Sequence, residues 1–157
     1  MSMLDKLETR VNEIEALHSK LLLLIGSPGI GKSQLLTDLA ARKDTTVLKV
    51  GAELGRKLAN LPQRQRTLQA NTLLRELADT HATDGLLLLD NIELLFDRSL
   101  KLDPLDLLKQ HSKALRIVVA WPGDIKNDRL VYAQLGHPEY QEYSLEGLVP
   151  FELNKIN

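Results

Sequence analysis

The residues best suited to chemistry in this sequence form a glycine-rich loop at positions 26 to 33. The loop is Gly26-Ser27-Pro28-Gly29-Ile30-Gly31-Lys32-Ser33, which matches the pattern G-x-x-x-x-G-K-[ST] at every fixed position. Glycines let successive backbone N–H groups turn inward toward an anion, and a helix that follows adds the positive end of its dipole. The loop therefore predicts a site for the phosphates of a nucleoside triphosphate.

Two side chains of this loop have separate expected roles. The Lys32 ammonium would reach the β- and γ-phosphates, and the Ser33 hydroxyl would complete the coordination of a phosphate-bound Mg²⁺. A glycine-rich turn without a ligand is disfavoured, because an apolar run precedes the full match and a helical pattern follows it. The residues expected to contact the nucleotide are Gly26, Ser27, Pro28, Gly29, Ile30, Gly31, Lys32, Ser33 and Gln34.

A carboxylate is also needed near the metal, and Asp90 is the candidate. It follows four leucines at 86–89, so we expect it at the end of a buried strand, facing Ser33 and holding the Mg²⁺ shell. The alternative is an aspartate that caps the next turn.

Hydrolysis further requires a group that orients the attacking water. Asn91 and Glu93 are the candidates, and Glu93 is alternatively a plain acidic residue at a helix start.

Two arginines are candidates for stabilising charge on the transferred phosphoryl group. Arg129 and Arg98 would act within the subunit or on a neighbouring one, and the alternative for each is a solvated surface cation. Trp121 ends the fourth expected strand, where its apolar ring does not suit nucleotide sensing. Asp124 or Asn127 would suit that role better.

The remaining titratable residues suggest no second site of comparable strength. The histidines show no spacing that places two on one helix face as metal ligands; they are His18, His81, His111 and His137. A cationic group before the third expected strand would contact nucleic acid or simply form a solvated helix face. It comprises Arg56, Lys57, Arg64, Arg66 and Arg75, with Glu53, Glu76 and Asp79 nearby.

Alternating strand and helix patterns predict an α/β fold. Apolar runs and β-branched residues indicate strands at 21–25, 45–50, 85–90, 115–121 and 139–145. Helical patterns cover 4–18, 34–41, 53–82 with a break near Pro62, and a segment starting at Asp103-Pro104. Segment 122–138 is rich in loop residues, with one short element at 129–135. We expect a three-layer α/β/α sandwich with a parallel sheet that binds its ligand at the carboxyl ends of the strands.

Length and composition favour one domain over residues 1–157. We divide it into an N-terminal helix at 1–18, a nucleotide-binding core at 21–145 and a tail at 146–157. The helix would cover its own core or contact another subunit. The chain lacks cysteine and has a formal net charge of −1, which excludes disulfides and thiolate zinc sites and argues against a broadly basic nucleic-acid binder. Apolar runs are too short to cross a bilayer and no signal peptide is recognisable, so a cytoplasmic location is expected.

The motifs GSPGIGKS at 26–33 and LLLLDNIELLF at 86–96 resemble those of the additional-strand P-loop ATPases, in particular AAA+ and STAND-type domains. This resemblance implies ATP and Mg²⁺ as ligands and a sheet order of 5-1-4-3-2. The overall pattern, including segment 136–140, is similar to the BrxF family, the small P-loop proteins of type III BREX phage-exclusion systems. That similarity implies a bacterial defence role beside larger BREX proteins and DNA modification machinery.

The sequence departs from AAA+ proteins at two points. It leaves no room after about residue 146 for a helical lid, and Asn91 stands where the usual glutamate is found. We therefore expect slow turnover and a nucleotide-gated assembly switch, either a homo-oligomer or a component that docks a larger partner. The alternatives are a small-molecule kinase, for which an arginine-rich lid is missing, and a DNA-binding module controlled by nucleotide. No Asn-Lys-x-Asp guanine motif occurs, which favours ATP.

Overall fold

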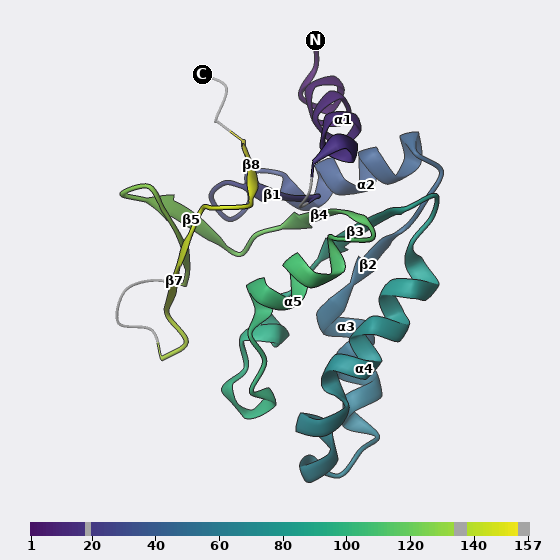
Figure 1. Ribbon diagram of the computed structural model, residues 1–157, viewed down its shortest axis with the longest axis vertical. Coiled ribbons are helices and arrows are strands. Elements are labelled where there is room, and N and C mark those ends of the chain that lie inside the picture. Colours follow the sequence, from purple (N-terminus) through teal and green to yellow (C-terminus); the bar gives the residue numbers. More distant parts are fainter. Residues whose placement is uncertain (18–19, 134–137, 154–157) are drawn as a thin grey trace.

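The main sheet of the protein has five strands that all run parallel to their neighbours. A computed structural model describes residues 1–17, 20–133 and 138–153, and its sheet has the spatial order β2-β3-β4-β1-β8 (Figure 1). The strands are β1 (Leu21–Ile25), β2 (Val47–Lys49), β3 (Leu86–Asp90), β4 (Arg116–Ala120) and β8 (Val149–Glu152). The predicted α/β class with a five-stranded parallel sheet is confirmed.

One strand prediction is wrong. Segment 139–145 was expected to be the fifth strand of the sheet, but its β7 (Gln141–Ser144) pairs antiparallel with β6 (Arg129–Tyr132) in a separate sheet. The place beside β1 is taken by β8, from the segment expected to be a tail. Proline lacks an N–H donor and is tolerated at the edge of a sheet, so Pro150 fits this position. The core therefore extends to residue 153, where the Leu153 N–H donates to the Ile25 carbonyl at 2.7 Å.

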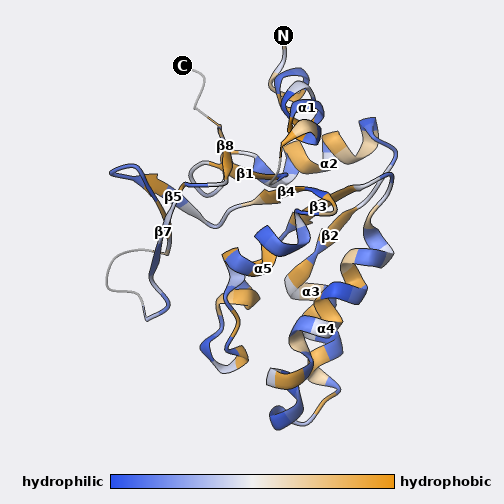
Figure 2. Cartoon of the chain, in the orientation of Figure 1, coloured by the Kyte–Doolittle hydropathy of each residue, from blue (hydrophilic) through white to orange (hydrophobic). Residues whose placement is uncertain are grey.

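The leucine runs of the central strands supply the core on both faces of the sheet. Successive strand side chains point to opposite faces, so Leu21 and Leu23 belong to one buried cluster and Leu22 and Leu24 to the other. The leucines of β3 divide in the same way. Because helices cover both faces, these strands are apolar throughout rather than alternating. Figure 2 shows the contrast with the helices, whose surfaces are partly hydrophilic.

Two groups of helices cover the two faces of the sheet (Figure 1). The buried side chains of α1 (Met3–Glu13) and α2 (Lys32–Arg42) join one cluster, and those of α3 (Val50–Ala59), α4 (Gln63–His81) and α5 (Pro104–His111) join the other. Short 3₁₀ turns lie at η1 (Ile14–Ala16), η2 (Glu93–Phe96) and η3 (Arg98–Leu100). Among the described residues, no helix combines the length and apolar character needed to span a membrane.

Two helix boundaries confirm their sequence signals. The predicted break near Pro62 separates α3 from α4, and α4 begins at the next residue. Helix α5 starts at Pro104, and the side chain of its N-cap Asp103 accepts from the Asp106 N–H at 3.2 Å. Proline at the first helical position costs no hydrogen bond, because that N–H has no partner within the helix. These local signals set the ends of the helices that cover the larger core cluster.

Helix α1 packs on its own chain. Its buried Leu7 and Val11 join the cluster beneath α2, and Arg42 of α2 bonds the Asp5 carboxylate at 2.7 Å and Glu8 at 3.3 Å. The helix is shorter than the predicted 4–18, because it passes into η1 at Ile14. Of the two roles considered for this segment, the structure shows the covering of its own core.

The ion pair at Asp5 predicts a measurable acid titration. The hydrogen bond from Arg42, helped by those from Ser2, lowers the pKa of Asp5 from 3.8 to about 2. Because the folded pKa is depressed, the stabilisation is present above pH 3.8 and is lost as the pH falls toward 2. In the Arg42→Gln variant, an NMR titration should show the Asp5 pKa raised toward 3.8, with the Ser2 hydrogen bonds still holding it below that value. A pKa still near 2 would show that Arg42 is not the main cause.

The second sheet is an antiparallel unit inserted between β4 and β8. It has the order β5-β6-β7, where β5 is Gly123–Lys126. A tight turn joins β5 to β6 through Asn127 and Asp128, at φ 52° and 60°, the left-handed conformations that two-residue hairpins favour. The sequence predicted loop here with one element at 129–135; β6 is that element, and β5 was missed. Residues 134–137 lie outside the described part of the chain.

Candidate functional site

The loop after β1 makes a tight turn into α2. Gly29 and Gly31 have φ of +80° and +112°, and Gly31 is the N-cap of the helix. A Cβ at Gly26 would lie 2.7 Å from the Ile30 side chain, so any larger residue here would force Ile30 to shift. Helix α2 begins at Lys32, two residues before the predicted start. The loop therefore presents the N-terminal end of an eleven-residue helix beside the carboxyl end of β1.

The Lys32 ammonium bridges this loop and the end of β4. Its Nζ donates to the Gly26 carbonyl at 2.9 Å and to the Trp121 carbonyl at 2.8 Å. Burial lowers the pKa of Lys32 from its usual 10.5, while Asp90, Glu93 and Asp124 oppose that shift. A cation is thus held next to the loop with three carboxylates in its surroundings.

A cavity of about 520 Å³ opens at the carboxyl ends of β1, β3 and β4. The loop after β1 contributes Gly26, Ser27, Pro28, Lys32 and Ser33 to its lining. From β3 and the turn after it come Asp90 and Glu93. The fold thereby brings Lys32, Ser33 and Asp90 to one cavity, although strand β4 separates β1 from β3 in the sheet.

The two candidates for orienting water are placed differently. Glu93 begins η2 and lines the cavity. Asn91 is not part of the lining: its carbonyl accepts from the Gly51 N–H at 2.8 Å, and its side-chain oxygen would lie 2.3 Å from a Cβ on Gly51. Its φ of 56° turns the chain away at the end of β3. The catalytic assignment of Asn91 from sequence therefore has no support in the geometry.

The candidate arginines lie outside the cavity lining. Arg129 forms an ion pair with Glu142 on the neighbouring strand at 3.3 Å, and Arg98 donates to the Pro138 carbonyl. Gln34 likewise does not line the cavity, since its amide donates to Asp38 at 2.8 Å along α2. Gly29, Ile30 and Gly31 shape the loop without lining the cavity.

Of the two proposed sensing residues, only Asp124 is in the lining. It lies on β5, whereas Asn127 occupies the hairpin turn.

The cationic residues of helices α3 and α4 are partly paired. Arg56 contacts Glu53 at 3.2 Å, and Arg66 donates to the Leu61 carbonyl at 3.1 Å.

The histidines form no metal site in the described chain. His81 Nδ1 contacts the Leu77 carbonyl at 3.0 Å. Burial, then the nearby Arg75, lowers the pKa of His111. His18 and His137 fall outside the described residues. In residues 1–17, 20–133 and 138–153, no group of three or more His, Cys, Asp or Glu side chains is arranged to hold a metal by itself.

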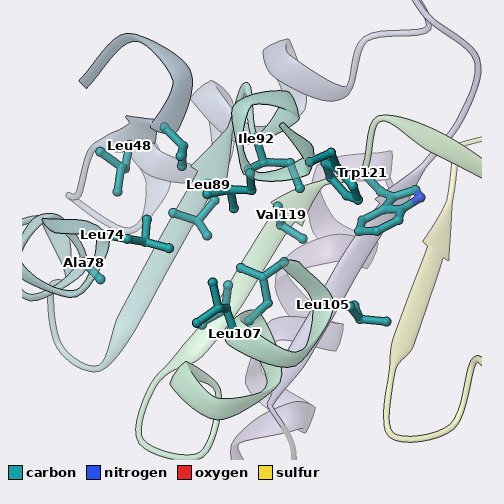
Figure 3. Close-up of a cluster of buried hydrophobic side chains, with 14 of the residues drawn as sticks. Leu48, Leu74, Ala78, Leu89, Ile92, Leu105, Leu107, Val119 and Trp121 are labelled. Carbon is teal, nitrogen blue, oxygen red and sulfur yellow. The ribbon is translucent and has the colours of Figure 1, made fainter. Parts of the chain in front are cut away.

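The sequence did not predict that the second sheet, called the hairpin wall below, would form one side of this cavity. Trp121, Lys126 and Tyr132 all line it. Trp121 is fully buried, donates through Nε1 to the Val131 carbonyl at 2.9 Å, and meets the Phe96 ring edge-on at 5.5 Å. Figure 3 shows its indole in the same cluster of buried side chains as Val119 and Ile92. The signal that would have found this wall is the Asn127-Asp128 turn between two short alternating segments.

A substitution at Gly123 tests how closely β5 packs against β6 and Trp121. A Cβ there would overlap the Val131 carbonyl oxygen and lie 2.8 Å from Trp121 Nε1, so Gly123→Ala should destabilise the protein by roughly 1–3 kcal/mol. Gly55→Ala is the matched control, because its Cβ would meet only the Leu94 side chain at 3.7 Å inside a helix that favours alanine. Urea denaturation should separate the two variants. Equal stability would show that β5 and β6 are not packed as described.

A scan of the sequence against models of protein families found no match, and neither did a search of curated proteins.

Proposed function

We propose that this protein binds Mg-ATP in the cavity beside the loop 26–33 and hydrolyses it slowly. The observation that carries the proposal is the convergence of Lys32, Ser33 and Asp90 on one cavity at the carboxyl ends of the strands. Parallel α/β sheets bind ligands at this edge. The full match of the loop to the phosphate-binding pattern supports the same ligand. A cavity of about 520 Å³ is also within the range of sites for small molecules.

The donor set fits a triphosphate tail that carries a divalent cation. The helix N-terminus and the Lys32 ammonium would bind phosphate oxygens, and Lys32 would exchange its two carbonyl acceptors for them. Three carboxylates line or surround this region, namely Asp90, Glu93 and Asp124, and they would repel an uncompensated polyphosphate. Mg²⁺ prefers oxygen ligands and commonly takes one or two from protein and the rest from phosphate and water. The Ser33 hydroxyl and the Asp90 carboxylate would hold it, and the ion would neutralise charge on the phosphates.

Glu93 is the residue proposed to act on water. As a carboxylate in the cavity lining, it would accept a proton from the water that attacks the γ-phosphorus, while the bond to the leaving ADP oxygen breaks. Neither candidate arginine lines the cavity. Turnover should accordingly be slow in the isolated protein.

Phosphate release under Mg-ATP tests this assignment. Glu93→Gln should retain nucleotide binding and lose most hydrolysis, by about 10²–10⁴-fold if it is the general base. Asp90→Asn should weaken the dependence of binding on Mg²⁺. Glu76→Gln is the matched control, because Glu76 is exposed on α4. Release by Glu93→Gln at the rate of this control would contradict the role given to Glu93.

The resemblance to the BrxF family extends the proposal to a biological role. On that basis the protein is a nucleotide-dependent assembly or regulatory component of a BREX-type phage-defence system, with other BREX proteins, and DNA through them or directly, as its partners. Light scattering with and without Mg-ATP tests the assembly step. Unaltered protein should form a larger species only with nucleotide, and Lys32→Ala should not. A species of constant size in every condition would argue against the assembly role.

A further inference from the structure

Lys126 is a second cation of the cavity, and no role was expected for it from sequence. It is the last residue of β5 and lines the cavity together with Asp124, two positions earlier on the same strand. Residues two apart on a strand share a face of the sheet. The opposite face of this small sheet packs into the core through Ile125, Leu130, Tyr132 and Tyr143. The sheet therefore has an apolar face against the core and a charged face that carries Lys126.

The neighbouring cation on this face is already engaged. Lys126 pairs across the hairpin with Arg129, so their side chains lie on the same face. Arg129 forms its ion pair with Glu142 and does not line the cavity. Lys126 does line it, and has no ion-pair partner among the described residues. Of the two, Lys126 is the one positioned to meet a ligand.

The strand that carries Lys126 is firmly held. The tight turn at Asn127 and Asp128 fixes Lys126 opposite Arg129. On the next strand, the Tyr132 ring stacks on Phe96 with centroids 3.7 Å apart and planes within 10°. Core packing thus anchors the small sheet through Tyr132, and the exposed side chain of Lys126 would move toward a ligand.

We propose that Lys126 binds the terminal phosphate of the nucleotide and supplies, within the same subunit, part of the stabilising charge that an arginine commonly provides. This inference rests on the proposed function. Lys32 and Lys126 are the cations of the lining, and they come from two different walls, the loop after β1 and the hairpin after β4. Lys32 would bind the triphosphate at the loop 26–33. Lys126 would then stabilise the negative charge on the γ-phosphate oxygens while water attacks and the bond to ADP breaks.

The test compares ATP with ADP, because ADP lacks the group that Lys126 is proposed to bind. Affinities for Mg-ATP and Mg-ADP are measured by calorimetry for the unaltered protein, Lys126→Ala, Lys126→Arg and the exposed-helix control Lys57→Ala. Loss of a charge-assisted bond should weaken ATP binding by Lys126→Ala about tenfold and ADP binding less than about twofold. Lys126→Arg should restore most of the preference for ATP, and Lys57→Ala should change neither affinity.

The outcomes separate this inference from the proposed function. If the unaltered protein binds both nucleotides and Lys126→Ala keeps the same ratio of ATP to ADP affinity, the role of Lys126 is overturned and the proposed function stands. An equal loss of both affinities also overturns it, since that result places Lys126 elsewhere or makes its role structural. If the unaltered protein binds neither nucleotide, the proposed function fails and this inference fails with it. Circular dichroism of each variant confirms that the fold is intact.

Discussion

Replacing Lys32 with methionine should weaken the binding of Mg-ATP by about a hundredfold or more, with the fold retained. Lys32 would give up charge-assisted hydrogen bonds to two phosphate groups, each of which contributes roughly 1.5–3 kcal/mol. Methionine keeps an unbranched side chain of similar length, so packing between the loop and β4 changes little. The measurement is displacement of a fluorescent ATP analogue at equilibrium.

The matched control for this prediction is Lys57→Met, an exposed lysine on α3 that should leave affinity unchanged. Thermal unfolding of both variants shows whether any loss of binding reflects unfolding. An affinity for Lys32→Met within a few-fold of the unaltered protein would mean that the ammonium bound by Gly26 and Trp121 is structural and does not contact phosphate.

Replacing Trp121 with alanine should have the largest effect on stability, a loss of about 3–5 kcal/mol. The indole is fully buried, donates to the Val131 carbonyl at 2.9 Å, and meets the rings of Phe96 and Tyr143 edge-on. Its removal creates a cavity and leaves that carbonyl without its donor. Because Trp121 also joins β4 to the hairpin wall, nucleotide affinity should fall together with stability.

Urea denaturation followed by circular dichroism measures this effect, since Trp121 is the sole tryptophan and its fluorescence disappears with it. The control is Leu68→Ala, because Leu68 is 77% exposed on α4 and should change stability by less than about 0.5 kcal/mol. A loss below about 1 kcal/mol for Trp121→Ala would contradict the packing described for the hairpin.

The sequence predicted well those elements whose structure is determined by residues close to them in the chain. Loop 26–31 shapes itself through its glycines, and the leucine runs before Gly26 and Asp90 mark strands covered on both faces. Two such strands in one parallel sheet end at the same edge, so the sequence could place Ser33 and Asp90 near each other, and both line the cavity there. Local signals also placed the break at Pro62 and the start of α5.

The strand prediction that failed depends on contacts between distant segments. Both 139–145 and the segment after it are short and alternating, and nothing local tells which one pairs with β1. The structure gives that place to β8, and the next residue, Leu153, would lie 3.4 Å from a Cβ added to Gly26. The role of Asn91 stays a prediction; its side chain lies close to Gly51 and outside the cavity lining. The role of Arg129 also stays a prediction, and its ion pair with Glu142 forms only once β6 and β7 are aligned.

A crystal structure of the protein with Mg²⁺ and a non-hydrolysable ATP analogue tests the central claim most directly. We expect the β- and γ-phosphates within hydrogen-bond distance of Lys32 Nζ, which will have left the Trp121 carbonyl, and Mg²⁺ between the Ser33 hydroxyl and Asp90. An analogue bound elsewhere at saturating concentration, or no bound analogue with Lys32 still on the Gly26 and Trp121 carbonyls, would contradict it.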